Sequence, residues 1–382
     1  MTVRYIDEFR DPALAQSIAT GIARAADPGR AYTLMEFCGG HTHAIFRYGI
    51  PNLLPANVRM IHGPGCPVCV LPMSRIGQAL QLVREHGATL CTYGDMLRVP
   101  GPQRMTLLKA KAEGADVRMV YSCLDAMALA EREPDRTVVF FAIGFETTTP
   151  PTAVALQLAK ARGLTNFFVH CNHVLTPPAI VHLLATADAG NGAAAVPLDG
   201  FVGPAHVSTV IGWGAFEPFA AVYRRPVVVA GFEPLDVMQA ILMLIRQLNE
   251  GRAEVENEYV RAVSREGNMK AQAVMADVFE LRDTFEWRGL GDVPLSALRI
   301  RDAYAQFDAE RLFELRDERV ADNKACDCPD VLRGLKQPTE CKLFANLCTP
   351  DNPIGSCMVS SEGACAAYYS YGRAREDVRA TA

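Results

Sequence analysis

The middle of the chain repeats one pattern, in which an apolar run leads through a Gly- or Pro-marked turn into an amphipathic helix. These runs and turns are VRMIHGPGCPVC, TVVFFAIGFETTTPP, NFFVHCNHVLTPP, GFVGPAHVS and PVVVAGFEPLD. Strands that alternate with helices predict βαβ units and parallel sheet, so the predicted fold class is α/β. Because ligands of open parallel sheets bind outside the carboxyl ends of the strands, we expect these turns to line a cleft.

The two ends of the chain differ from this middle part. From about Met238 to Arg319 the pattern becomes helical and charged, with few strand signals, and a cysteine-rich tail follows. The N-terminal thirty residues are also helix-like and are expected to pack on the C-terminal part. The length of 382 residues is enough for two or three domains.

Charge and hydropathy argue against two classes of partner. The formal net charge is −5 and no long Lys/Arg run compensates for it, so we expect no nucleic-acid partner. No apolar run approaches the ~18 residues that would indicate a membrane span. The N-terminus lacks a basic start followed by an apolar core, so no secretory signal is predicted. We therefore expect a cytoplasmic protein with no membrane partner.

Twelve cysteines are many for a chain without an export signal. In a reducing cytosol such thiols more often bind metal or do redox chemistry than form structural disulfides. Cys91, Cys123 and Cys171 lie in or just after apolar runs and are expected to be buried as small hydrophobes. The others form an early set and a tail set, namely Cys38, Cys66 and Cys69, and Cys326, Cys328, Cys341, Cys348, Cys357 and Cys365. The sequence therefore predicts two separate cysteine sites.

The early set begins in EFCGGHTHAIFRYG, where Cys38, His41 and His43 surround a Gly-Gly pair. We expect a flexible turn there, because paired glycines let the backbone approach a ligand closely. A thiolate and two imidazoles suit metal binding, although an inert loop explains the same residues about as well. Cys66 and Cys69 form a C-x2-C pair at an expected helix start, where the helix dipole lowers a thiol pKa. Such a pair is typical of a dithiol/disulfide couple or of a metal clamp.

The tail set suits an iron–sulfur cluster. A [4Fe–4S] cluster needs four thiolates, and loops marked by Pro and Gly can wrap it. Zinc uses the same ligands but usually on two C-x2-C knuckles, and the tail has none, so we favour iron–sulfur over zinc. Elsewhere, Glu146 in GFETTT could orient a ligand or relay protons, or could equally satisfy a helix start.

Seven segments together carry a family resemblance. They are CGGHTH, GPGCPVC, TYGDMLRVPG, GFETTTP, GPAHVSTVIG, VVVAGFEPLD and the tail CKLFANLCTPDNPIGSCMVSSEGAC, spread from near residue 30 to about residue 372. In this order they resemble the HypD family of [NiFe]-hydrogenase maturation proteins. The resemblance implies two Rossmann-like parallel-sheet domains flanking a cleft, at 45–130 with the CPVC turn and at 131–235. It also implies a mainly helical, cysteine-rich [4Fe–4S] domain made of 1–44 and 236–382.

The resemblance also implies a function. The family is a scaffold on which the Fe(CN)2CO group of the hydrogenase active site is assembled with the chaperone HypC, with cyanide arriving from HypE. Cys38 resembles the family's cysteine that binds this iron together with a cysteine of HypC. Cys66 and Cys69 resemble its cleft thiol pair, with a redox or iron-holding role, and His41 and His43 become proton-handling groups by analogy. We expect a maturation factor rather than a conventional turnover enzyme.

Two questions stay open at this point. The tail has more cysteines than a cluster needs, and we favour Cys328, Cys341, Cys348 and Cys365 as ligands, with Cys357 close behind and Cys326 least favoured. The rival functions are a self-contained iron–sulfur oxidoreductase, which reduces a small molecule or a protein disulfide through the C-x2-C pair, and a zinc-stabilised binding protein. The oxidoreductase has no use for Cys38, whereas the scaffold depends on it.

Overall fold

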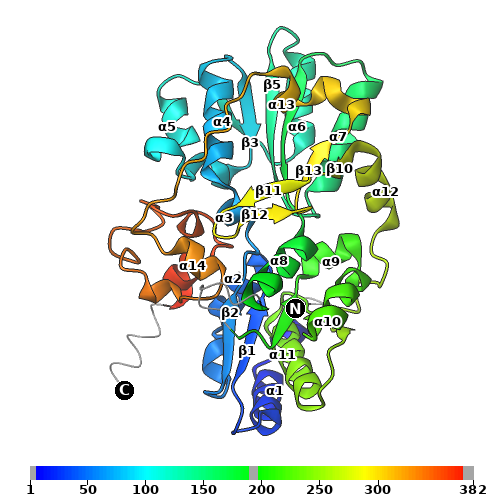
Figure 1. Ribbon diagram of the computed structural model, residues 1–382, viewed down its shortest axis with the longest axis vertical. Helices are drawn as coiled ribbons and strands as arrows, with labels where there is room; N and C mark the ends of the chain where they lie inside the picture. Colours follow the sequence, from blue (N-terminus) through cyan, green and yellow to red (C-terminus); the bar gives the residue numbers. More distant parts are fainter. Residues whose placement is uncertain (1–5, 189–196, 373–382) are drawn as a thin grey trace.

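The computed structural model describes residues 6–188 and 197–372, and its core is two parallel sheets in two α/β lobes (Figure 1). The sheet of the first lobe has the order β2-β1-β7-β8-β9, with every neighbouring pair parallel. Its strands are β1 (Tyr32–Glu36), β2 (Val58–His62), β7 (Gly200–Gly203), β8 (Val227–Val229) and β9 (Val255–Asn257). Its helices are α1 (Pro12–Ala25), α2 (Gly39–Tyr48), α8 (Thr176–Asp188), α9 (Ala205–Ile211), α10 (Glu217–Tyr223) and α11 (Pro234–Asn249).

The sheet of the second lobe has the order β4-β3-β5-β6 and is also parallel throughout. Its strands are β3 (Thr89–Thr92), β4 (Val117–Met119), β5 (Val138–Gly144) and β6 (Phe167–His173). Its helices are α4 (Met73–Arg84), α5 (Leu107–Ala112), α6 (Cys123–Arg132) and α7 (Thr149–Ala161). The central strand β5 is buried along its whole length, as expected where helices cover both faces of a parallel sheet.

These two sheets confirm the predicted α/β fold, and they divide the chain in an unexpected way. The first sheet is made of residues 32–62 and 200–257, while the second takes only residues 89–173. The predicted ranges 45–130 and 131–235 therefore do not coincide with the sheets, because β2 lies beside β1 and not beside β3. The repeated pattern indicates where strands occur along the chain but not which sheet each strand joins.

The C-terminal part is less helical than expected. Residues 250–319 contain α12 (Met269–Val278) and α13 (Ala309–Leu312), but also β9 and the strands β10 (Phe279–Leu281), β11 (Thr284–Trp287), β12 (Gly291–Pro294) and β13 (Leu298–Ile300). β10 pairs with β13 and β11 with β12, both antiparallel. Each of these strands has only three or four residues, too few for their alternation to stand out against the helix-period positions.

The tail and both lobes share one apolar core. The cluster that contains Met35 of β1 also contains Phe141 of β5, Trp287 of β11 and Met358 of the tail. In Figure 1, β11 and β12 lie between the lobes, and the tail helix α14 (Cys328–Leu332) lies beside their junction. A second tail helix, α15 (Ala364–Ala367), packs on α2. No helix in residues 6–188 and 197–372 has the length and apolar composition needed to cross a bilayer.

Candidate functional site

Cys38 lies at the point of the first sheet where the strand order reverses. The chain runs from β1 outward to β2 and later returns on the other side of β1 with β7. In open parallel sheets this switch point is where ligands bind, outside the carboxyl ends of the strands. Cys38 lies two residues after the end of β1 and is the N-cap residue of α2, with its side chain buried. The fold therefore places the first conspicuous cysteine of the sequence at the expected ligand position.

The Gly-Gly pair after Cys38 is not the flexible turn that we expected. Gly39 and Gly40 form the first turn of α2, and the glycines are needed for close packing instead. A Cβ on Gly39 would lie 3.0 Å from Cδ of Glu362 and closer still to its Cβ. A Cβ on Gly40 would lie 2.8 Å from Cδ1 of Phe232. The two glycines thus let the tail and the loop after β8 approach the start of α2.

The Gly63-Pro64-Gly65 turn after β2 packs directly on the backbone of Cys38. A Cβ on Gly65 would lie 2.7 Å from Cα of Cys38, a distance that real side chains do not reach. The Gly39 N–H donates to the Gly65 carbonyl at 3.1 Å, and the Gly63 N–H donates to the Glu36 carbonyl at 2.9 Å. The next residue after this turn is Cys66. The glycines therefore bring the C-x2-C segment against Cys38.

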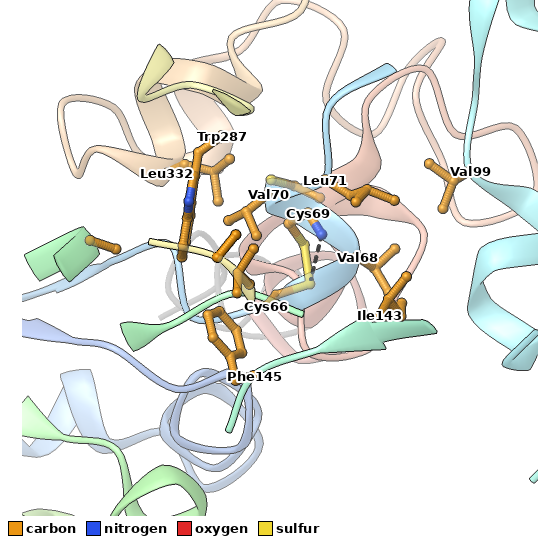
Figure 2. Packing of buried hydrophobic residues seen from close by; sticks show 14 of the residues in the cluster. Cys66, Val68, Cys69, Val70, Leu71, Val99, Ile143, Phe145, Trp287 and Leu332 are labelled. Carbon is orange, nitrogen blue, oxygen red and sulfur yellow. Dashed lines mark hydrogen bonds between the residues drawn. A yellow bond between two sulfur atoms is a disulfide. The ribbon is translucent and has the colours of Figure 1, made fainter. Parts of the chain in front are cut away.

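Cys66 and Cys69 form a disulfide, with their Cα atoms 5.2 Å apart. Cys66 is the N-cap of the short helix α3 (Pro67–Val70), so the predicted helix start is confirmed. Figure 2 shows the disulfide in an apolar environment that includes Phe145, Trp287 and Leu332. The pair is therefore buried between both lobes and the tail.

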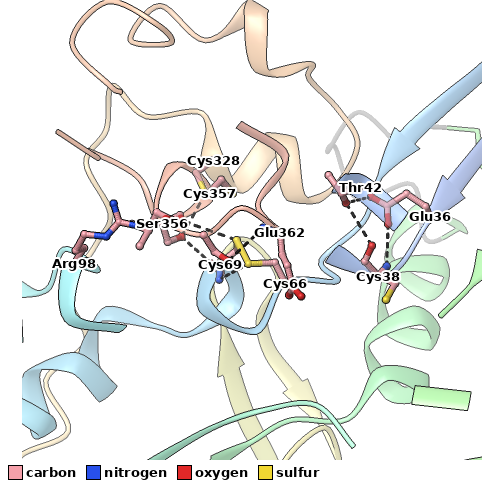
Figure 3. Close-up of a disulfide and its surroundings, with 12 residues drawn as sticks. Glu36, Cys38, Thr42, Cys66, Cys69, Arg98, Cys328, Ser356, Cys357 and Glu362 are labelled. Atoms are coloured by element: carbon pink, nitrogen blue, oxygen red, sulfur yellow. Dashed lines mark hydrogen bonds between the residues drawn. A yellow bond between two sulfur atoms is a disulfide. The ribbon is translucent and has the colours of Figure 1, made fainter. Parts of the chain in front are cut away.

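Glu36 organises the surroundings of Cys38. This carboxylate is fully buried at the end of β1, and its Oε2 accepts the backbone N–H of Cys38 at 2.9 Å (Figure 3). Its Oε1 accepts the hydroxyl of Thr42 and Nδ1–H of His62, the latter at 2.6 Å. Three donors from β2, from the N-cap and from α2 thus converge on one carboxylate, which fixes the backbone that carries Cys38.

The Cys38 thiol is held in its protonated form. Burial, assisted by the negative charges of Glu362 and Glu36, raises its pKa to about 12, although the backbone N–H groups of Gly40 and His41 favour the thiolate. A thiol with such a pKa is a poor nucleophile at neutral pH. It ionises when a cation replaces the proton, as in metal ligation.

The two histidines of CGGHTH have different environments. His41 is buried, and its Nε2 lies 3.0 Å from the backbone carbonyl oxygens of both Ala230 and Gly231. Because carbonyl oxygens only accept hydrogen bonds, Nε2 carries the proton and Nδ1 keeps its lone pair. Nδ1 is buried without a hydrogen-bond partner in the described structure, and burial lowers the pKa of His41. His43 is half-buried, with its ring centroid 5.1 Å from that of Tyr371. His41 is therefore a neutral proton acceptor in the first turn of α2, whereas His43 faces the tail.

Glu146 makes the contacts of a helix cap. Its carboxylate accepts the backbone N–H of Thr176 at 2.8 Å and the Thr176 hydroxyl at 3.0 Å, at the start of α8. Burial raises its pKa to about 7. Phe145, the preceding residue, packs in the apolar cluster of the disulfide. Of the two interpretations from the sequence, these contacts match the helix start, while the raised pKa leaves the carboxyl able to exchange a proton near neutral pH.

All six tail cysteines gather around one small cavity. Its lining is Cys326, Cys328, Cys341, Phe344, Cys348, Gly355, Cys357, Met358 and Cys365. The five favoured residues are among them, and so is Cys326, which the sequence made the least favoured. Gly355 allows this, because a Cβ there would lie 2.5 Å from Sγ of Cys326. The tail thus brings together residues up to thirty-nine positions apart, from 326 to 365.

The donor set of this cavity suits a sulfur-ligated cluster. Arg288, which is 4% exposed, has Nε and Nη2 without hydrogen bonds, and its Nε forms an ion pair with Asp322 at 3.5 Å. The charge of Arg288 contributes to lowering the pKa of Cys328, after the hydrogen bonds from Cys326 and Cys357. A cation near several thiols favours their ionised form. Sγ of Cys328 and Sγ of Cys357 lie 2.6 Å apart, and because each iron of a [4Fe–4S] cluster takes its own cysteine, loading would separate them. In the described residues no three His, Cys, Asp or Glu side chains are arranged to hold a single metal ion as they stand.

Ser356 connects the disulfide with the cysteine cavity. Its hydroxyl donates to the Cys69 carbonyl at 2.9 Å and lies 3.6 Å from Sγ of Cys328. Its own carbonyl oxygen lies 3.9 Å from Sγ of Cys69 (Figure 3). Cys38, the disulfide and the cavity are therefore consecutive neighbours, with Gly65 joining the first pair and Ser356 the second.

Several of these residues were not among the candidates from the sequence. Glu36 accepts the Cys38 N–H, Thr42 and His62 donate to Glu36, Ser356 donates to the Cys69 carbonyl, and the charge of Glu362 opposes ionisation of Cys38. Glu36 and His62 end two apolar runs, a position that could have indicated them. Ser356 and Glu362 lie in the tail segment that carries the resemblance, but their residue types alone do not indicate these contacts.

Comparison with known proteins assigns this arrangement to a family. A sequence model of HypD, described as the hydrogenase formation hypA family, matches residues 13–372. The chain belongs to the HypD family. The resemblance carried by the seven segments is thereby confirmed.

Relatives within the HypD family align over the whole chain. The hydrogenase maturation factor HypD of Azotobacter vinelandii is 64% identical over 380 residues, which cover 100% of both chains. The HypD of Cupriavidus necator is 64% identical over 374 residues, 98% of each chain, and that of Escherichia coli is 46% identical over 374 residues, 97% of this chain and 98% of the other. As a HypD-family protein, the chain has a role in hydrogenase maturation.

Proposed function

We propose that this HypD-family chain is the scaffold on which the Fe(CN)2CO group of [NiFe]-hydrogenase is assembled, with Cys38 as a protein ligand of the iron. It works with a HypC-type chaperone and receives cyanide from a HypE-type donor in the cytoplasm. It is a maturation factor with a redox role rather than a conventional turnover enzyme.

The placement of Cys38 is the observation that carries this proposal. Iron that bears cyanide and CO is soft, and thiolate is the matching protein ligand. Cys38 lies at the switch point of a parallel sheet, against the C-x2-C segment and against the tail. It also precedes α2, whose helix dipole favours anionic ligands such as cyanide near its first turn. The site thus combines a soft ligand for the iron with an environment suited to its anions.

While the Cys66–Cys69 disulfide is intact, a second thiolate for the iron comes from a partner. Cys66 and Cys69 are joined in a disulfide, and the free cysteines nearest in sequence to Cys38, Cys91 and Cys123, are fully buried in the second lobe. Cys38 alone supplies one bond, which suits an iron group that is passed on rather than kept. A cysteine of a HypC-type chaperone completes the coordination and gives the partner a way to carry the iron away.

The disulfide and the tail support the redox part of the proposal. A [4Fe–4S] cluster held by four of Cys328, Cys341, Cys348, Cys365 and Cys357 would supply one-electron transfer. Two successive one-electron transfers through the cluster from an external electron-donor protein, together with two protons, would reduce the Cys66–Cys69 bond to two thiols, which are then free to hold iron. Ser356 keeps this bond beside the cavity. His41, with its free Nδ1 lone pair, and His43 handle protons near Cys38.

Infrared spectroscopy in the cyanide and CO stretching region tests the proposal. The protein is purified without oxygen from cells that make the hydrogenase and its maturation partners. We expect cyanide and CO bands in the unchanged protein and in Cys91→Ala, which removes a buried thiol far from the site, and no such bands in Cys38→Ala. Bands that persist in Cys38→Ala would refute the role of Cys38. Protein that contains a cluster but shows no bands at all would favour the thiol oxidoreductase.

A further inference from the structure

We propose that His62 is a positioning residue that holds Cys38 in place through Glu36. The two residues face each other across the sheet, since Glu36 at the end of β1 is in register with His62 at the end of β2. Both side chains are buried, with 0% and 5% of their surface exposed. Nδ1 of His62 lies 2.6 Å from Oε1 of Glu36 and donates its proton there, because a carboxylate only accepts.

The carboxylate that His62 binds is the one that fixes Cys38. Glu36 accepts the backbone N–H of Cys38 at 2.9 Å and the hydroxyl of Thr42, which itself lies in the first two turns of α2. A buried carboxylate that loses one of its donors has an unsatisfied oxygen, so its side chain turns toward another donor or toward water. This movement weakens its hydrogen bond to the Cys38 N–H. His62 therefore acts on a cysteine that it does not touch.

The other side of His62 faces an opening. His62 lines a pocket between β2 and the tail, together with Phe46, Gln337, Thr339 and Tyr368. Nε2 makes no hydrogen bond within residues 6–188 and 197–372, so it is the free nitrogen of the ring, directed away from Glu36. A small molecule that enters this pocket can thus reach the position of the imidazole without passing Cys38.

A purely structural role for His62 makes a different prediction. Its ring lies 4.9 Å from that of Phe46, so it also fills space. His170 on β6 is a matched comparison, because it is fully buried, lies 5.2 Å from the ring of Phe141 and is hydrogen-bonded to Gln78, yet it has no connection to Cys38. If the His62 ring only filled space, removing the His62 ring and removing the His170 ring would change the exposure of Cys38 to a similar extent.

The rate at which iodoacetamide alkylates Cys38 measures this positioning. Cys38 is 6% exposed, so the reagent reacts only when the segment opens locally. The full-length chain is purified without oxygen and without partners, and the alkylated peptide is quantified by mass spectrometry. We expect His62→Leu, which retains an apolar contact but no donor, to accelerate the reaction at least about tenfold, because a hydrogen bond to a charged group is lost. His62→Asn, whose amide can replace Nδ1–H, should keep a rate close to that of the unchanged protein.

Two further measurements separate positioning from packing. In His62→Ala, added imidazole should enter the pocket and slow the alkylation again, whereas His170→Ala should leave the Cys38 rate unchanged and imidazole should not affect it. The inference is contradicted if His62→Leu reacts at the unchanged rate, if His62→Asn reacts as fast as His62→Leu, or if His170→Ala gives the same acceleration. The readout does not depend on iron, so its failure would leave the proposed scaffold function standing, and the loss of infrared bands tests that function separately.

Discussion

The chain contains two cysteine sites built on opposite principles. Around Cys38 there is one free thiol, whose backbone N–H donates to Glu36 and whose backbone packs closely on Gly65, with two carboxyl groups that oppose its ionisation. Around the tail cavity six thiols face one another on loops, with a buried arginine beside them. A single ligand of high pKa suits a group that is bound for a time and released, whereas several thiols beside a cation suit a group that stays. The difference therefore separates the cargo site from the resident site of the proposed scaffold.

Removing one thiol from each site tests most strongly whether the Cys38 site and the tail cavity hold different iron. Cys328→Ser should remove most of the iron retained after purification without partners, because the proposed cluster lies in the tail. Cys38→Ser should leave that iron in place. Both variants should abolish hydrogenase maturation in cells. Iron analysis of the two proteins checks the distinction, and equal iron loss in both would show that the two sites are one.

A loss of stability is expected at the glycine that joins Cys38 to the C-x2-C segment. Gly65→Ala places a Cβ 2.7 Å from Cα of Cys38 and should lower the free energy of unfolding by about 2–3 kcal/mol, because backbone cannot give way as a side chain can. Gly21→Ala on α1 is the control, since its Cβ would lie 3.6 Å from Leu242 and should be neutral or stabilising. Urea unfolding of both variants measures the difference. Equal stabilities would mean that the two segments are not in contact.

The buried carboxyl group of Glu146, at the end of the second sheet, should make the free energy of unfolding depend on pH. Its pKa of about 7 lies above the usual 4.5, so the folded state binds a proton that the unfolded state has lost. The free energy of unfolding should then fall as the pH rises from about 4.5 to about 7, by on the order of 3 kcal/mol. Glu146→Gln should lose this dependence. Urea unfolding at pH 5 and pH 8 provides the comparison, and parallel curves for the two proteins would contradict it.

The smallest expected effect lies at the contact between the disulfide and the tail cavity. Ser356→Ala removes the hydroxyl that donates to the Cys69 carbonyl and should lower the free energy of unfolding by about 1 kcal/mol. Ser361→Ala, at an exposed neighbouring position, should change it very little. Thermal unfolding of the two variants measures this. A Ser356→Ala protein as stable as the control would indicate that Ser356 does not hold the two sites together.

Much of this arrangement was readable from local pattern. The helices after GPGCPVC and GFETTTP, the parallel sheets and the helix-start position of Cys66 follow from turn chemistry and apolar runs that lie next to each other in the sequence. The gathering of cysteines in the tail followed from their number alone. In each case the interacting residues were close together or of one kind.

The features of the fold and the site that the sequence did not predict depend on contacts between segments far apart in the chain. No local signal places β2 beside β1 rather than beside β3, because strand pairing is decided by packing of the whole sheet. The Gly-Gly pair looked like a flexible turn because the residues that require it, Glu362 and Phe232, are far away in the sequence. Glu36 and His62 were missed for the same reason, since each is ordinary until the sheet brings them into register. Cys326 was the least favoured cysteine, yet Gly355 makes room for it at the cavity.

The Mössbauer spectrum of protein grown on iron-57 tests the central claim most directly, because it distinguishes the two kinds of iron in one sample. The unchanged protein is purified without oxygen from cells that make the maturation partners. Its spectrum should show a low-spin component from the iron that carries cyanide and CO, and a second component from the irons of the cluster. Cys38→Ala should lose only the low-spin component. Loss of both components together in Cys38→Ala, or retention of both, would contradict the separation of a cargo site at Cys38 from a resident site in the tail.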